Sequence, residues 1–87
     1  MTSVRIPSQL QSYTGGATCV EAAGETVDQV LRDLDRRYPG IRFRVIDEQD
    51  RVRRHMRLFV GTEAATDIRA GLSDGDELLI FGALSGG

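Results

Sequence analysis

Lysine is absent from this chain of 87 residues, and all 11 of its basic residues are arginine. No side-chain amine is therefore available for a Schiff base, for acetylation or for an isopeptide bond. Cys19 is the only cysteine and His55 the only histidine. Together they provide neither an intrachain disulfide nor a metal cluster of Cys and His. A single cysteine favours a reducing compartment, and we expect the protein to be cytoplasmic.

Long hydrophobic runs are also missing. No stretch approaches the roughly 18 apolar residues that a membrane-spanning helix requires, and the N-terminus lacks the apolar core of a signal peptide. The formal net charge is −2, which disfavours a dedicated nucleic-acid-binding protein, because such domains carry a basic surface. We expect one small domain that acts at neither a membrane nor a nucleic acid.

The side chains that usually carry enzyme chemistry are few and scattered. Cys19 lies inside a predicted strand, where a small buried thiol is the usual role. His55 lies in an arginine-rich segment and is expected to be solvated. Gly15 and Gly16 lack the Lys-Ser/Thr of a phosphate-binding loop, and no carboxylates form a clear acid–base pair. We therefore predict that the chain is not an enzyme and binds no metal and no cofactor of its own.

The N-terminal part of the sequence predicts a hairpin. Val4 and Ile6 alternate with polar residues before Pro7, as in a short strand. A second strand, "ATCVEA", follows the turn signal Gly15-Gly16. The connection is longer than the two-residue loop that is most favourable for a hairpin.

A helix over residues 26–38 is the clearest element. Thr26 and Gln29 have the spacing of a capping box, and one apolar stripe follows: Val27, Val30, Leu31, Leu34 and Tyr38. Pro39-Gly40 ends the helix. The next segment, "IRFRVID", has the period of a strand, although its place directly after a helix stop also suits a short helical turn.

The C-terminal half predicts further strands. In "MRLFVGT", Met56, Leu58 and Val60 face inward by period. A tight turn at residues 73–76 precedes a strand over residues 77–81 that is apolar on both faces, which suits the middle of a sheet. The architecture is then α+β: a mixed sheet of four to five strands, with one main helix across one face, over residues 1–81.

Two surface features remain. The cluster of Arg51, Arg53, Arg54 and Arg57 is either a solvated edge that blocks aggregation or a docking patch for an acidic partner. Residues 82–87 form a predicted flexible tail that ends in Gly86-Gly87 and reaches about 20 Å when extended. Glycines without side chains can pass a narrow channel. The ionised terminal carboxylate reacts only after activation, for example as an acyl adenylate.

The helix "TVDQVLRDLDRRYPG", the segment "LSDGDELLIF" and the final "GG" together resemble the ubiquitin-like sulfur carriers. These β-grasp proteins are related to the small subunit of molybdopterin synthase and to the thiamine-pathway sulfur carrier. The N-terminal "IPSQLQSYTGG" is similar to the cysteine-biosynthesis carriers of actinobacteria. The resemblance covers nearly the whole chain and implies a β-grasp fold.

The resemblance also implies a chemistry for the tail. An activating enzyme of the ubiquitin-activating type, using ATP and Mg²⁺, would adenylate the carboxyl of Gly87, and a sulfur donor would convert it to a thiocarboxylate. Gly86 would pass through the channel of the partner. The residues implied in partner binding are Gly82, Ala83, Leu84, Ser85 and Gly86 in the tail, Phe81 before it, and Arg57, Leu58 and Phe59 on a neighbouring strand.

Several alternatives stay open. The sulfur acceptor is a cysteine synthase-like enzyme, the large subunit of molybdopterin synthase or a synthase of a sulfur-containing metabolite. The chain could itself be the small subunit of molybdopterin synthase. It could also be a protein modifier joined through Gly87 to lysines of other proteins, or a plain binding module with an inert tail. Gly82 and Ser85 depart from the proline and alanine that are common in such tails, so partner preference is expected there.

Overall fold

The structure, a computed structural model, describes residues 1–82 and has one five-stranded sheet. The strands are β1 (Thr2–Arg5), β2 (Cys19–Ala22), β3 (Met56–Val60), β4 (Glu63–Ala64) and β5 (Glu77–Gly82). Their order in the sheet is β2-β1-β5-β3-β4, with β1 and β5 parallel and the other neighbours antiparallel. The mixed sheet and the central place of the last strand confirm the prediction.

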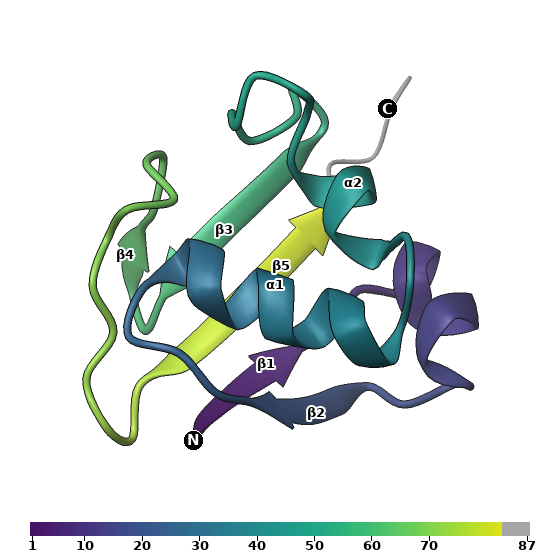
Figure 1. Cartoon of the computed structure of the whole chain (residues 1–87), viewed down its shortest axis with the longest axis horizontal. Coiled ribbons are helices and arrows are strands. Elements are labelled where there is room, and N and C mark those ends of the chain that lie inside the picture. The colour runs from purple at the N-terminus through teal and green to yellow at the C-terminus, as the bar shows by residue number, and fades with distance from the viewer. Residues whose placement is uncertain (83–87) are drawn as a thin grey trace.

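The helix α1 (Val27–Arg37) crosses one face of this sheet, and the short helix α2 (Ile41–Val45) lies on the same side (Figure 1). The apolar stripe of α1 is buried against inward-facing residues of the sheet. The stripe consists of Val27, Val30, Leu31 and Leu34, and the sheet contributes residues such as Val4, Leu58, Leu78 and Ile80. Helix and sheet thus enclose one core between two layers.

The start of α1 is capped as the sequence predicts, with one difference. The Thr26 side chain accepts a hydrogen bond from the backbone N–H of Gln29, at 3.1 Å. In return, the Gln29 side chain accepts from the N–H of Glu25, at 2.8 Å, and not from Thr26 as in the usual capping box. Two backbone donors at the start of the helix are satisfied in this way.

The strand interpretation of residues 41–47 is wrong, and the helical alternative is correct. Ile41 and Val45 are buried while Phe43 is 51% exposed. A spacing of four residues fits both two strand repeats and about one helical turn, so only Phe43 separates the two cases. Gly40 (φ 96°) makes the turn, and the Asp35 carboxylate accepts hydrogen bonds from the N–H groups of Gly40 and Arg42 at the helix start.

Two elements were not foreseen. β1 and β2 pair as predicted, but the segment that joins them contains a 3-10 helix, η1 (Ser8–Thr14), whose Leu10 enters the core. β4 has only two residues, which are too few to show a period. β5 runs through Gly82, the residue at which the predicted tail begins, and residues 83–87 lie outside the described part of the chain.

Candidate functional site

The face of the sheet that α1 and α2 do not cover carries an apolar patch, formed by Phe59, Leu79 and Phe81. Phe59 lies directly opposite Leu79 in the β3–β5 register, and Phe81 is the next residue on the same face of β5. Phe81 is 49% exposed, and Phe59 and Leu79 are half-buried. These outward side chains explain why β5 is apolar on both faces: one face fills the core, and the other presents the patch.

The two phenylalanines contact each other edge to face. Their ring centroids are 5.7 Å apart and the ring planes meet at 78°, which is a favourable aromatic geometry. Arg57 lies opposite Phe81 in the register and is exposed, and its guanidinium donates to the carbonyls of Arg54 and Met56, both at 2.8 Å. The structure thus brings three of the predicted partner-binding residues, Phe81, Phe59 and Arg57, together at one place.

Leu58, the fourth predicted residue of this region, is placed elsewhere. It is only 2% exposed and its side chain lies in the core, on the face that α1 covers. Neighbouring residues of a strand point to opposite faces, so the Leu58 side chain does not belong to the apolar patch of Phe59, Leu79 and Phe81. In this structure its contribution to the patch is indirect, through the packing of β3.

Gly82 ends β5 directly beside this patch, paired with Met56 of β3. The side-chain amide of Gln9, on η1, lies over it so closely that a methyl group added at Gly82 would overlap that amide. The absence of a side chain at Gly82 therefore leaves room for Gln9. The other predicted tail residues, Ala83, Leu84, Ser85, Gly86 and Gly87, lie outside the described residues.

The prediction of a buried thiol at Cys19 is wrong. Cys19 is exposed at the start of the edge strand β2, and its Sγ lies 3.0 Å from Ser3 Oγ. It points, with Glu21, to the face that the helices leave open. His55 is exposed, as expected. Among residues 1–82, no cluster of three His, Cys, Asp or Glu side chains could hold a metal ion.

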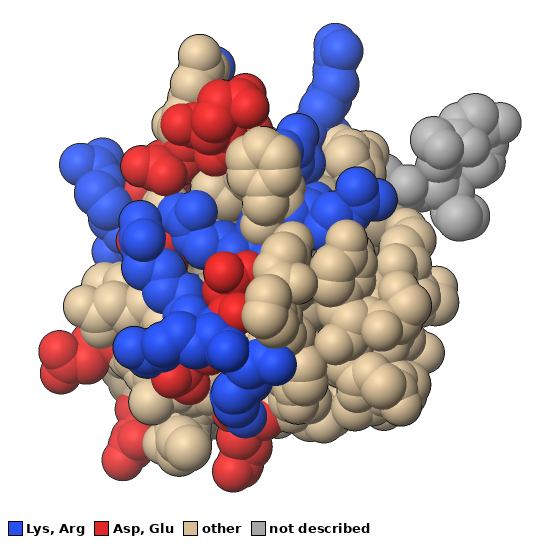
Figure 2. Space-filling model, turned by 45° about the vertical axis from the view of Figure 1, so that its right-hand side comes forward, with Lys and Arg blue, Asp and Glu red and all other residues tan. Residues whose placement is uncertain are grey.

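Ion pairs occur mainly around α1 and α2. Arg42 joins the two helices through Asp28 at 2.8 Å, and Arg32 pairs with the same carboxylate at 2.9 Å. Burial raises the pKa of Asp28, but hydrogen bonds from Arg32 and Arg42 outweigh it, so the pKa lies below its usual value. Figure 2 shows acidic and basic side chains interspersed on this side of the molecule. Pairs of this kind neutralise charge locally and define no binding site.

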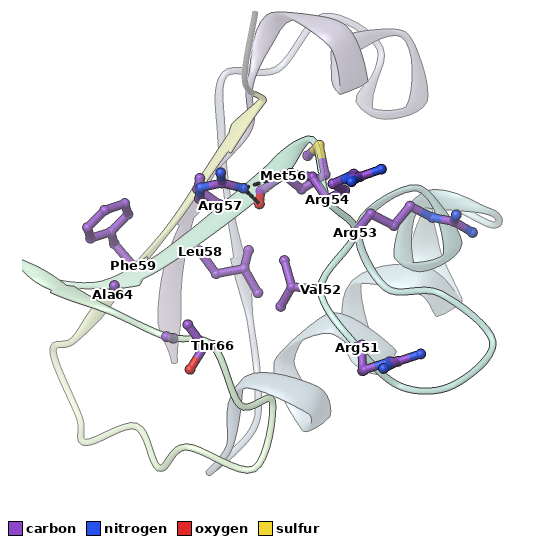
Figure 3. Close-up of a pocket in the computed structure, with 11 residues that line it drawn as sticks. Arg51, Val52, Arg53, Arg54, Met56, Arg57, Leu58, Phe59, Ala64 and Thr66 are labelled. Carbon is purple, nitrogen blue, oxygen red and sulfur yellow. Dashed lines mark hydrogen bonds between the residues drawn. The ribbon is translucent and has the colours of Figure 1, made fainter. Parts of the chain in front are cut away.

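A groove lies on the far side of β3 from β5 (Figure 3). It has a volume of about 340 Å³ and is bounded by β3, by residues 51–54 and by residues 64–66. The arginine cluster predicted as an edge or a docking patch lines it.

In the part of the chain that the structure describes, no helix is long and apolar enough to cross a membrane.

The sheet order, the helix across one face and the parallel β1–β5 pair define a ubiquitin-like β-grasp protein. Residues 4–87 match the ThiS family, and the chain belongs to that family.

Individual relatives narrow the comparison. The chain is 33% identical to the sulfur carrier protein CysO of Mycobacterium tuberculosis, over 98% of this chain and 97% of that protein. The structure also matches a chain of the BexX/CysO complex of Amycolatopsis orientalis, with a TM-score of 0.92 and 34% identity over all of both chains. SAMP1 of Haloferax volcanii, a small archaeal modifier protein, matches with a TM-score of 0.76 and 26% identity, over 99% of this chain and 98% of that one. These matches confirm the resemblance to ubiquitin-like sulfur carriers of the cysteine-biosynthesis type that the sequence indicates.

Proposed function

We propose that this protein is a sulfur carrier that acts as a co-substrate of partner enzymes. The observation that carries the proposal is the match to CysO along the whole chain, in a family match that reaches Gly87. The apolar patch beside the end of β5 supports it, because a partner that binds Phe59 and Phe81 would hold the chain at the root of its diglycine tail.

The proposed chemistry has three steps: activation of the carboxylate, addition of sulfur and transfer of sulfur. In a partner enzyme of the ubiquitin-activating type, with ATP and Mg²⁺, a carboxylate oxygen of Gly87 attacks the α-phosphorus of ATP and pyrophosphate leaves. A sulfide nucleophile then attacks the acyl carbon, a C–S bond forms, and AMP leaves with the oxygen. No atom changes its net oxidation state. The thiocarboxylate sulfur then attacks an electrophilic carbon in an acceptor enzyme, and cleavage of the acyl–sulfur bond by water leaves the sulfur on the acceptor and restores the Gly87 carboxylate.

Intact-mass measurement tests this proposal. The protein is incubated with its activating enzyme, ATP, Mg²⁺ and sulfide, and we expect a mass gain equal to the difference between sulfur and oxygen. Two variants serve as controls, one without Gly87 and one with a single residue added after it, and neither should be converted. An active partner enzyme that leaves the wild-type mass unchanged would refute the proposal. Function that survives in either variant would instead indicate a binding module with an inert tail.

The acceptor is the next question. The similarity to CysO favours a cysteine synthase-like enzyme, and the match to the BexX/CysO complex keeps a metabolite synthase as an alternative. The large subunit of molybdopterin synthase is a third candidate, which would make this chain the small subunit. Copurification with the thiocarboxylate form, followed by single-turnover sulfur transfer to each enzyme, separates the three.

The similarity to SAMP1 favours a second function, conjugation through Gly87 to lysines of other proteins. This chain contains no lysine, so it could not form lysine-linked chains of its own. Blots of a tagged form in its native cells distinguish the functions: a ladder of covalent adducts supports conjugation, and a single free band supports the carrier role alone.

A further inference from the structure

The four arginines at the groove beside β3 differ from most arginines of this protein. Six arginines pair with a carboxylate within 4.0 Å: Arg5, Arg32, Arg36, Arg37, Arg42 and Arg69. Arg51, Arg53, Arg54 and Arg57 form no such pair with any carboxylate of residues 1–82. These four arginines thus form no ion pair within this part of the chain, although Asp47 lies near enough for the charges of Arg51 and Arg53 to help lower its pKa.

Internal contacts hold this segment in place. Arg53 donates from Nε to the Phe43 carbonyl at 2.7 Å, and its guanidinium lies 4.5 Å from the centre of the Phe43 ring. Arg57 is fixed by its bonds to backbone carbonyls. Each guanidinium has five N–H donors, so both keep donors for an external group while their positions are set.

The floor of the groove is apolar. Val52 and Leu58 point toward each other across it in Figure 3, and Met56, Ala64 and Ala65 complete it. In Figure 3 the side chains of Arg51 and Arg53 point to the side opposite Val52, so a segment that places an apolar residue on this floor would meet their charges at the outer rim of the groove. A nucleic acid would meet the arginines but would leave this floor without a partner.

Strand addition does not explain how the groove would bind. β4 pairs with β3 only at Phe59 and Val60, which leaves the edge uncovered from Met56 to Leu58. Three backbone groups there are already engaged: the Met56 N–H donates to the Arg53 carbonyl, the Met56 carbonyl accepts from the Arg57 side chain, and the Leu58 carbonyl accepts from the Ala65 N–H at 2.8 Å. Recognition must then come from side chains.

We propose that this groove binds an acidic segment of a protein partner, with one apolar residue on the floor and carboxylates on the guanidiniums of the rim. Arginine and carboxylate form strong, often bidentate hydrogen bonds, which supply both attraction and orientation. Phe59 lines the groove and also belongs to the apolar patch, so one partner could contact both surfaces. The proposal does not depend on the chemistry of the tail.

NMR titration of the ¹⁵N-labelled protein with a capped peptide of sequence EEDLDE tests it. We expect amide shifts confined to residues 51–59 and 64–66, and a loss of binding as salt is raised. The peptide KKNLNK, with the opposite charge, should cause no such shifts. No response to EEDLDE, or shifts centred elsewhere, would overturn the proposal.

Matched variants separate the groove from the overall charge. The double variant Arg51→Gln and Arg54→Gln should weaken EEDLDE binding about tenfold, because two charge-assisted contacts are lost. The variant Arg32→Gln and Arg36→Gln removes the same charge from α1 and should bind like the wild type. Overlaid spectra check that both fold. Equal weakening by both variants, or tighter binding of a single-stranded oligonucleotide in the groove, would contradict the proposal. Since the probe binds the free protein, failure here leaves the sulfur-carrier proposal intact, and the reverse also holds.

Discussion

Phe81 on β5 and Phe59 on β3 meet edge to face on the uncovered side of the sheet, with ring centroids 5.7 Å apart. Phe81 is 49% exposed although it belongs to the central strand. About half of this side chain is left for a partner to cover, and burial of that area would stabilise a complex. Phe81 lies one residue before Gly82, so a partner that binds this pair also holds the point at which the predicted tail begins.

Replacement of Phe81 by alanine is expected to impair recognition by the activating enzyme. We expect kcat/KM for adenylation to fall about tenfold, through a higher KM with a retained kcat, because docking is lost and not the reacting group. Arg36→Ala is the control, because Arg36 is exposed and lies on α1, which covers the other face of the sheet. Steady-state kinetics with the carrier as the varied substrate measure kcat and KM for both variants. A fall in kcat alone, or an equal effect of Arg36→Ala, would argue against docking through this patch.

Leu58 should behave as a core residue. Leu58→Ala is expected to lower the free energy of unfolding by about 2–4 kcal/mol, because a fully buried methyl-rich side chain leaves a cavity. Leu79 lies on β5, on the opposite face of the sheet, and is half-buried. Leu79→Ala should therefore lower the free energy of unfolding less. Urea denaturation at constant pH compares the two variants. A loss for Leu58→Ala no larger than that for Leu79→Ala would show that the face assignment of β3 is incorrect.

The contact between Gln9 and Gly82 can be tested by a double-mutant cycle. Gly82→Ala should be close to neutral, because its methyl group must displace the Gln9 amide, while alanine loses less entropy than glycine in a strand. In the Gln9→Ala background the same substitution should stabilise the protein by about 0.5–1 kcal/mol, since the space is then open. Thermal unfolding of the four proteins gives the coupling. Additive effects would mean that Gln9 does not cover the root of the tail in solution.

Asp67 provides a pH-dependent prediction. Arg69 donates to its carboxylate from the side chain, at 2.9 Å, and from the backbone N–H, at 2.9 Å, and these bonds lower the pKa of Asp67 from 3.8 to about 2. A lowered pKa means that the ionised form favours the folded state. That stabilisation is complete above pH about 4 and is lost as the pH falls through about 2.

The variant Arg69→Gln should raise the pKa of Asp67 toward 3.8 without reaching it, because the backbone N–H bond remains. ¹³C NMR titration of the carboxyl group measures the change. Arg36→Gln, which alters a distant ion pair, should leave the pKa of Asp67 unchanged. No shift in Arg69→Gln would mean that the side-chain pair is broken in solution.

Much of the fold could be predicted because a regular period shows which residues share a face. The stripe of α1 and the alternation of Met56 and Leu58 identified buried residues correctly. Period alone does not say which face the helix covers, and this explains the error at Cys19: it shares its face with the exposed Glu21. Helix α2 was ambiguous because Ile41 and Val45 fit both periods. The groove depends on contacts between distant segments and leaves no local pattern.

The place of β5 between β1 and β3 also has a mechanical consequence. An enzyme that draws the end of the chain into a deep channel applies a force along β5 at Gly82. β5 is bonded to β3 up to Gly82 and to β1 at Glu77–Leu79, so this force loads the two ladders in shear and several hydrogen bonds share it. An edge strand such as β2, peeled from its end, would lose its bonds one after another. A central strand therefore resists a force along its axis better than an edge strand does.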